Sequence, residues 1–354
     1  MAYSIRWNES YSLQIRIMSV DKNTWVNKKE LTNVIGVSIH KTANDEYPLL
    51  ESGDMQFVSD TASPFENGWY RIEALFQQGG VAARLPLATL MFASYGGTTK
   101  WNYTDYDVQG YSVLKPLEER VLRTGEYIPK GENVSRWIAN KIKECTPAPV
   151  LIRNGFTLTD PLVFASGTSY LQAIWTALDA KGYVIQIDGN GRIIITKMPS
   201  NPALVLDSST AGLIVPEISW NADISNIPNR YYAVSPIDGT IAVARNVDVS
   251  SPTSYQKRGR RWVDYFDDSP SLTDGESIDQ YARRKLQEVS DHFEKINIEH
   301  EFVPDVTVFD KIRCYLPNQN IEGLYVVEAQ ELSIGNGITI KESLSKESGG
   351  FKEY

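Results

Sequence analysis

The sequence predicts a β-dominated α+β protein built from two or three domains. Its 354 residues are too many for one ordinary hydrophobic core and suit units of roughly 100 to 150 residues. Short Val and Ile runs, mixed with Ser, Thr, Tyr and Trp, recur between turn residues, which favours strands. The apolar fraction of 42% and the charged fraction of 22% are typical of a globular protein.

The first region, residues 1–110, is a series of short strand-like segments. These segments are 5–20, 31–40, 55–59, 69–76, 81–95 and 106–113. The stretch SDTASPFENG between two of them is rich in turn-forming residues. Short strands separated by turn signals at regular spacing predict a barrel or a sandwich.

Helical periodicity marks a second region, residues 111–200. Apolar side chains recur at helical spacing from Asn133 to Cys145. The segment TPAP at 146–149 ends this helix, because proline cannot donate to the helix ladder and restrains its predecessor. We therefore expect an α+β unit here rather than a continuation of the first β region.

A second helix in this region has one apolar face at positions i, i+3, i+4 and i+7. The face is formed by Leu171, Ile174, Trp175 and Leu178. Ser166 or Thr168 can cap its first turn, because a hydroxyl oxygen accepts from a free backbone N–H there. Gly182 follows the last helical position and is expected to stop the helix in a left-handed conformation.

A β-hairpin follows this helix, with strands at 184–187 and 193–195. Its turn contains Asn190-Gly191, the pair that best tolerates the positive φ angles of a tight turn. The helix and the hairpin together predict a packing unit in which Trp175 is buried. Removal of that side chain in Trp175→Ala is then expected to cost roughly 3 to 5 kcal/mol.

The third region, residues 223–354, returns to β structure and carries one helix. Segments 229–234 and 240–244 predict a hairpin, and a long polar loop begins near residue 250. An amphipathic helix at 274–293 is expected to cover a sheet. Further strands are predicted at 296–302, 311–316, 324–329 and 338–341.

Charge and composition restrict the function classes. The net charge of −9 supplies no global basic field for nucleic acid, although it is compatible with a conduit that DNA passes without sticking. No run of 18 or more apolar residues predicts a membrane span, and the start MAYSIRWNES resembles no secretory signal. Cys145 and Cys314 are expected to be buried free thiols.

The sequence predicts no metal, cofactor or catalytic site. The only histidines, His40, His292 and His300, lack a second ligand at metal-binding spacing. The acidic turn that begins at Asp188 has Pro199 in the position where a calcium loop needs a bidentate Glu. There is also no nucleophile elbow, Cys-His signature or phosphate loop.

One dense basic cluster stands out and is interpreted as a partner contact. It consists of Lys257, Arg258, Arg260 and Arg261. Acidic residues follow directly, so the cluster is expected either to form ion pairs within the chain or to dock on an acidic neighbouring subunit. Nucleic-acid binding is the less economical interpretation, because the chain as a whole is acidic.

The segment 262–276 supports an alternative function as a carbohydrate-active or glycan-binding protein. Its acids could supply a glycosidase carboxylate pair, and its aromatics could stack on sugars. The acids are Asp264, Asp267, Asp268, Asp274 and Glu276, and the aromatics are Trp262, Tyr265 and Phe266. A solvated acidic loop is the more economical interpretation, and a glycan enzyme should lose activity when Asp267 or Asp268 is changed.

The order of these elements resembles the baseplate-hub and tail-tip hub proteins of tailed phages and phage-like particles. The resemblance rests first on the strand LTNVIGVSIHK at 31–41 and on the helix that ends in Gly182-Tyr183. It continues in the turn Asp-x-x-Gly-Arg at 188–192 and in the strand that closes near Pro199. The segment PDVTVFDKIRCYLP at 304–317 and a final hairpin resemble the closing barrel of that family.

This resemblance implies two small tube-like β-barrel domains around an inserted α+β domain. The implied domains are 1–110, with 201–222 as a candidate to complete it, 111–200 as the insert, and 223–354 with the helix 274–293. It implies a non-enzymatic homotrimer in the virion, made in the bacterial cytoplasm, that adapts a sixfold tail tube to a threefold tip and lines the DNA conduit.

The partners implied by the resemblance are other tail components. They are the tail tube or a distal-tail protein on one side, and a spike, fibre or tape-measure protein on the other, with DNA only in transit. A distal-tail adaptor is a further alternative within the same assembly.

Overall fold

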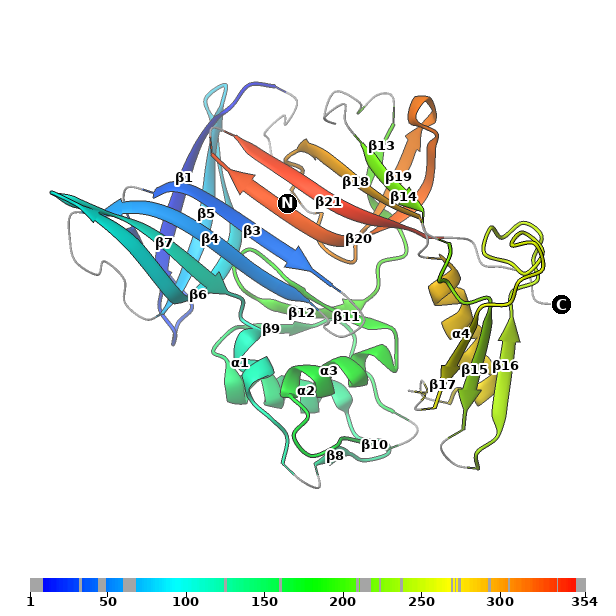
Figure 1. Ribbon diagram of the computed structural model, residues 1–354. Coiled ribbons are helices and arrows are strands. Elements are labelled where there is room, and N and C mark those ends of the chain that lie inside the picture. Colours follow the sequence, from blue (N-terminus) through cyan, green and yellow to red (C-terminus); the bar gives the residue numbers. More distant parts are fainter. Residues whose placement is uncertain are drawn as a thin grey trace.

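The computed structural model shows a β-dominated α+β architecture (Figure 1). The structure describes residues 9–31, 34–43, 49–59, 68–123, 126–158, 161–207, 210, 218–222, 224–235, 238–268, 270, 272, 275–291, 294–304, 306–335 and 337–347. Strands far outnumber helices in these residues, so the predicted fold class is confirmed.

The first β region is an antiparallel array of seven strands. Their bounds are β1 Ser12–Val20, β2 Asn27–Leu31, β3 Val34–Thr42, β4 Leu50–Ser59, β5 Trp69–Gln78, β6 Val81–Lys100 and β7 Tyr103–Tyr111. They are hydrogen-bonded in the order β3-β4-β7-β6-β5-β1-β2. Period-two alternation points Ile17, Ile72 and Phe57 into one apolar core, as expected for half-buried strands.

The second β region joins the first edge to edge. Its strands are β13 Pro202–Leu206, β14 Ser219–Ala222, β18 Glu294–Glu301, β19 Lys311–Leu316, β20 Ile321–Ile334 and β21 Ile338–Glu347, with a 3-10 turn at Pro317–Gln319. Strand β20 pairs antiparallel with β3, from Ala329 opposite Thr42 to Ile334 opposite Val37. The two β regions are therefore parts of one 13-stranded sheet (Figure 1).

The segment 201–222 belongs to the second β region, not to the first. Strand β13 runs parallel to β19, and β14 pairs antiparallel with β18. Leu206 is fully buried in a core shared with Ile312. The expectation that this segment completes the first domain is wrong, because its strand partners come from the end of the chain and leave no local trace in the sequence.

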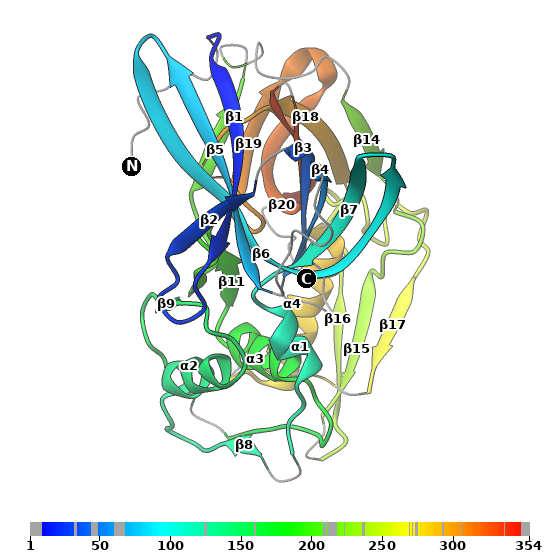
Figure 2. The same ribbon diagram turned by 90° about the vertical axis from the view of Figure 1, so that its left-hand side faces the viewer.

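The insert packs three helices and two small sheets, β11-β12-β9 and β10-β8, below the large sheet (Figures 1 and 2). Its elements are α1 Lys115–Glu119, β8 Tyr127–Ile128, α2 Val134–Cys145, β9 Val150–Ile152, β10 Leu162–Val163, α3 Tyr170–Asp179, β11 Tyr183–Ile187 and β12 Ile193–Lys197. Asn133 caps α2. The cap of α3 is Ser169, whose side chain accepts from the Gln172 N–H, and not the predicted Ser166 or Thr168. Ser169 immediately precedes the first helical residue, whereas Thr168 donates its hydroxyl to the Ala165 carbonyl.

A separate small unit projects beside the large sheet (Figure 1). It consists of β15 Arg230–Val234, β16 Ile241–Arg245, β17 Asp264–Asp267 and α4 Ile278–Asp291. Helix α4 packs on β15 and β16, so the predicted covering helix covers this unit and not the large sheet. Strand β17 lies within the segment predicted as a polar loop and pairs parallel with β15. Two parallel strands joined by a long connection leave no local pattern, which explains why β17 was not predicted.

Candidate interaction surfaces

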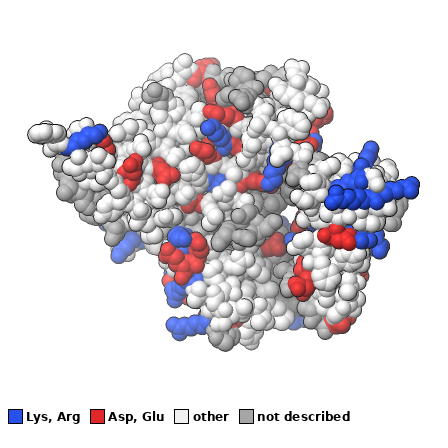
Figure 3. Space-filling model, in the orientation of Figure 1, with Lys and Arg blue, Asp and Glu red and all other residues white. Residues whose placement is uncertain are grey.

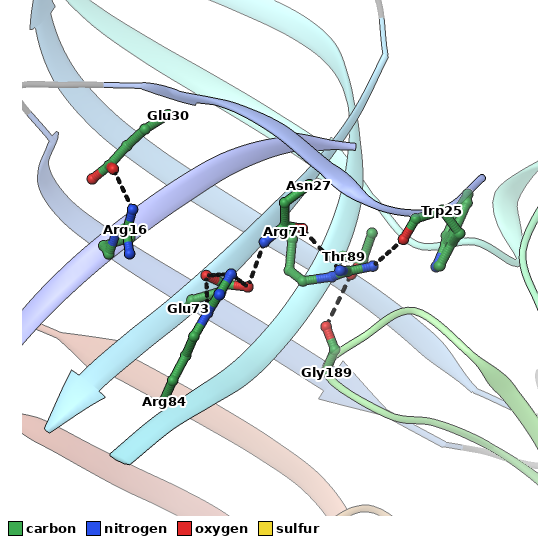
Figure 4. Close-up of polar contacts among 9 residues, drawn as sticks. All are labelled: Arg16, Trp25, Asn27, Glu30, Arg71, Glu73, Arg84, Thr89 and Gly189. Atoms are coloured by element: carbon green, nitrogen blue, oxygen red, sulfur yellow. Dashed lines mark hydrogen bonds and ion pairs between the residues drawn. The ribbon is translucent and has the colours of Figure 1, made fainter. Parts of the chain in front are cut away.

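The turn of the β11–β12 hairpin docks on the first β region at Arg71 and Thr89. Figure 4 shows Arg71 beside Thr89, which contacts Gly189 of the turn. The Arg71 side chain on β5 is only 6% exposed. Its Nη2 donates to the carbonyl oxygens of Asn190 at 3.0 Å and Trp25 at 3.3 Å. Its Nη1 donates to Asn27 Oδ1 at 2.8 Å, and its Nε donates to Thr89 Oγ1 at 3.2 Å. The guanidinium thus ties the insert to two parts of the first β region.

Close backbone approach at this joint requires its two glycines. Thr89 Oγ1 donates to the Gly189 carbonyl at 2.9 Å, and Trp25 Nε1 donates to the Asn190 carbonyl at 2.7 Å. A Cβ on Gly189 would overlap the Pro86 carbonyl group. Gly191 has φ +72°, and a Cβ there would lie 2.7 Å from the Thr89 Cβ.

The predicted turn residues therefore lie at a joint between domains. Asn190 and Gly191 do form the hairpin turn, but the turn also supplies carbonyl acceptors to the first β region. Sequence reasoning missed Arg71 and Thr89, which are isolated in the sequence and lie about 100 residues upstream. The only available signal was Gly189, because a tight hairpin turn does not need a second glycine.

Gly182 has the predicted conformation, but Trp175 is less buried than predicted. Gly182 has φ +65° and follows the end of α3, as expected for a helix stop. Trp175 is only half-buried and stacks on Phe309, with the ring centroids 6.4 Å apart. It therefore packs between the insert and the second β region, which corrects the expectation of a fully buried core residue.

The basic cluster lies on the loop that joins β16 to β17, and this loop is built on two buried asparagines. Asn229 donates through Nδ2 to the Arg261 carbonyl at 2.9 Å and accepts from the Val263 N–H at 2.8 Å. Asn246 donates to the hydroxyls of Ser251 and Thr253. Both asparagines are fully buried, so their hydrogen bonds fix the loop backbone.

This loop presents its cations outward. Lys257, Arg260 and Arg261 are exposed and, among the described residues, form no ion pair; Arg258 is half-buried and donates to the Ile227 carbonyl at 2.7 Å. Arg260 holds φ +63°, which is uncommon for a residue other than glycine. Figure 3 shows the basic side chains gathered at the outer end of the small unit. The described contacts therefore do not contain the ion pairs within the chain that were one of the two alternatives for this cluster.

The acids of segment 262–276 have structural partners instead. Asp264 forms a bidentate pair with Arg230, which holds the pKa of the Asp264 carboxyl below its ordinary value. Asp267 accepts from the hydroxyls of Tyr231 at 2.9 Å and Tyr281 at 2.7 Å. Burial, and then the hydrogen bond to Asp267, raise the pKa of Tyr231.

These contacts give the glycan alternative no support. Glu276 is bound by Arg284 through two hydrogen bonds, Asp274 lies outside the described residues, and Asp268 is exposed. A glycosidase needs two carboxyl groups facing one cleft. Asp264, Asp267 and Glu276 face arginine and tyrosine partners in the unit's own framework.

The remaining sequence candidates are scattered. His40 Nε2 lies 3.5 Å from Asp54, His300 is buried, and His292 lies outside the described residues. Within the described residues there is no group of three or more metal-ligating side chains and no helix long and apolar enough to cross a membrane. Both cysteines are free thiols, as predicted; burial raises the pKa of Cys314 to about 12, while Cys145 is half-buried.

A row of buried polar side chains crosses the seam between the two β regions. One comes from each of five adjacent strands, in the order Glu51, Lys41, Gln330, Glu342 and His300. Lys41 Nζ lies 3.4 Å from Glu51, Gln330 donates to Glu342 at 2.9 Å, and His300 Nε2 lies 3.2 Å from Glu342. Burial alone would lower the pKa of His300, but the hydrogen bond and charge of Glu342 outweigh burial and raise it.

The opposite face of these strands and of the adjoining β7 is polar, and its side chains are half-buried or exposed. It carries Ser38 and His40 of β3, Ser52, Asp54 and Gln56 of β4, Asp107 and Gln109 of β7, Asn297, Glu299 and Glu301 of β18, Glu331 and Ser333 of β20, and Thr339, Lys341 and Ser343 of β21. Five of these side chains are acids, one is a lysine and none is an arginine. Lys295 of β18 lies on this face as well and is paired with Glu328 at 2.6 Å.

Solved structures with the same architecture are phage tail proteins and a relative from a secretion system. The 43 kDa tail protein of prophage MuSo2 from Shewanella oneidensis aligns with a TM-score of 0.68 at 10% identity, over 95% of this chain and 98% of that one. A tail protein from Neisseria meningitidis aligns with a TM-score of 0.66 at 14% identity, over 97% and 98%. The chain has the fold of phage tail proteins.

A third structure extends the same likeness. A component of the type VI secretion system of E. coli, described as structurally similar to the T4 tail proteins gp27 and gp5, aligns with a TM-score of 0.51 at 10% identity, over 97% of this chain and 79% of that one. No family model matches the sequence, and no curated protein is significantly similar to it. The likeness to phage tail proteins that the sequence suggested is thus found in the fold.

Proposed function

We propose that this chain is a structural protein of a phage or phage-like tail tip, in which three copies form a ring between the tail tube and the tip. The ring adapts the sixfold tube to a threefold tip and surrounds the DNA conduit. The observation that carries the proposal is the single 13-stranded sheet, which places two β regions side by side in one chain. Three such chains present six β regions to a sixfold tube.

The exposed polar face of that sheet suits the wall of a conduit. It spans the seam, with Glu331 of the second β region directly opposite His40 of the first. Its carboxylates repel phosphate, and arginine, the residue most suited to bidentate phosphate contacts, is absent from it. DNA would pass such a wall without being held.

The joint at Arg71 supports a rigid adaptor rather than an enzyme. It fixes the insert against the first β region through three hydrogen bonds to the β11–β12 turn, donated by Arg71 and Trp25 to the Asn190 carbonyl and by Thr89 to the Gly189 carbonyl. The other hydrogen bonds of the buried Arg71 guanidinium hold it in place within the first β region. A protein that transmits geometry between two symmetries needs such fixed joints, whereas no described cleft gathers catalytic side chains. The insert is then the part that faces the tip proteins.

Mass photometry of the purified chain tests the ring. The expected result is a particle of three times the chain mass of 39.8 kDa, alone or on addition of the tail-tube protein. A chain that stays monomeric under both conditions contradicts the proposal. The replacement of Asp54 and Glu331 by lysine provides a second test, since it should leave assembly intact and slow DNA release.

A further inference from the structure

The small β16-β15-β17 sheet has a helix on one face only. Its inner face is covered by α4, where Tyr231, Ala233, Tyr281 and Leu286 form a core. Its other face, called here the outer face, carries Tyr232, Val234, Ile241, Val243 and Phe266, and the ion pair of Arg230 with Asp264 lies at one end of it. The pairs Tyr232–Val243, Val234–Ile241 and Tyr232–Phe266 are in register, so these side chains are contiguous.

The outer face is apolar and open. Phe266 is 59% exposed and Ile241 is 52% exposed, and the other three side chains are half-buried. Natural sheets bury one face and leave polar side chains on a solvated one. An apolar face of this kind on a protruding unit indicates a protein contact.

Unpaired cations lie at one end of this face. Arg245 ends β16, and Lys257, Arg260 and Arg261 stand on the loop that follows it; these four are called the rim cations. All four are exposed, and none forms an ion pair with a described residue. Arg230 lies at the same end but is already paired with Asp264. Figure 3 shows basic side chains gathered at this outer end of the small unit, with acidic side chains on the surface below them.

We propose that the outer face and the rim cations form a contact surface for a second copy of this chain. The inference rests on the proposed ring and names one of its interfaces. An apolar centre with aromatic side chains and an arginine-containing rim is the composition of a specific protein interface. The buried asparagines that fix the loop keep the rim cations in place before the partner arrives.

Charge complementarity favours another copy as the occupant. The chain carries −9, and removal of the four rim cations from that total leaves −13 for the rest. The rest of a neighbouring copy is therefore net acidic, which complements four cations that form no ion pair with a described residue. Nucleic acid fits less well, because the aliphatic side chains Val234, Ile241 and Val243 offer it neither stacking nor hydrogen bonds.

The experiment compares assembly of the full chain and three variants by mass photometry and sedimentation. Phe266→Asp with Ile241→Asp places charge on the outer face, and Arg260→Glu with Arg261→Glu reverses part of the rim. Val163→Asp is the matched control, because Val163 is 75% exposed on β10, away from this surface. Circular dichroism and the melting temperature verify that each variant folds.

The outer-face variant should weaken self-association by about 100-fold or more, the loss typical of an interface hot spot. The rim variant should weaken it less and flatten its dependence on salt, and the control should assemble as wild type. Folded variants that assemble as wild type overturn this inference and leave the ring intact. Binding of single-stranded DNA is measured for the same variants. If the rim variant loses this binding while its assembly is unchanged, the rim cations bind nucleic acid and this inference is overturned. A wild-type chain that never self-associates overturns the proposed function itself.

Discussion

The environment of Arg71 is the opposite of that of Arg260 and Arg261. Arg71 is buried and directs every nitrogen of its guanidinium to an acceptor in the joint with the insert. Arg260 and Arg261 are exposed, with no ion-pair partner among the described residues. The first arginine determines how domains are held together, and the second group remains available for another molecule.

The difference shows that arginine density in sequence does not measure structural importance. In the dense cluster at 257–261, Lys257, Arg260 and Arg261 are exposed and form no ion pair with a described residue, whereas the isolated Arg71 is buried and donates four hydrogen bonds. A buried cation must have all its donors satisfied, so its removal leaves several groups without partners. An exposed cation is solvated in any case.

Arg71→Ala should give the largest loss of stability. It leaves Asn27 Oδ1, Thr89 Oγ1 and two carbonyls short of a donor in a buried joint. We expect a loss of about 3 to 5 kcal/mol in the free energy of unfolding, measured by urea denaturation. Arg16→Ala is the control: Arg16 pairs with Glu30 at 2.6 Å (Figure 4), and both side chains are half-buried and reach solvent, so its loss should cost about 1 kcal/mol. Equal effects of the two variants would refute the role of the joint.

Gly189→Ala should be next, because its Cβ would overlap the Pro86 carbonyl group. Displacement of the turn should cost about 1 to 3 kcal/mol, which thermal denaturation can measure. Gly182→Ala separates crowding from backbone strain, since Gly182 has φ +65° but nothing within 4 Å of an added Cβ. Its cost should be about 1 kcal/mol. A smaller effect at Gly189 than at Gly182 would argue against tight docking.

Trp175→Ala should cost about 2 kcal/mol, less than a fully buried tryptophan, since the side chain is half-buried against Phe309. Phe309→Ala in the same background tests the contact through a double-mutant cycle. Strictly additive losses in that cycle would mean that the two rings do not stabilise each other.

The stability of the folded protein should depend on pH through His300, which lies at the seam between the β regions. The pKa of His300 is raised in the folded protein, so the folded state holds the proton more tightly than the unfolded state. The stabilisation is complete below the unfolded pKa of about 6.5 and is lost as pH rises through the folded pKa. Melting temperatures between pH 6 and 9 should therefore fall more steeply for wild type than for His300→Gln. Parallel curves would contradict the assignment.

The smallest effect on stability should come from the exposed cations. Arg260→Glu with Arg261→Glu should change the free energy of unfolding by no more than about 0.5 kcal/mol, because these side chains lack ion-pair partners in the described structure. Chemical denaturation of the monomeric fraction measures this directly. A large loss would place the cluster among the structural arginines with Arg71.

The sequence alone predicts those features that have local signals. The helix from Asn133 to Cys145, the stop at Gly182 and the β15–β16 hairpin follow from capping, periodicity and turn residues, and the structure confirms them. The free thiols of both cysteines also agree. These features depend on residues within about a dozen positions of one another.

Features that depend on distant residues could not be predicted. Strand β17 pairs with β15 about 34 residues away, and β13 pairs with β19 more than 100 residues away. The contact between Arg71 and Asn190 joins positions 119 residues apart. A single sequence contains no periodic or capping signal for such pairings, so the joint, the seam and the outer face emerged only from the structure.

Cryo-electron microscopy of the assembled tail tip tests the central claim most directly. The account predicts three copies around one axis, with the polar face that carries Asp54 and Glu331 turned toward the lumen. A sixfold ring of whole chains, a single copy, or a ring in which that face is turned away from the axis would contradict it.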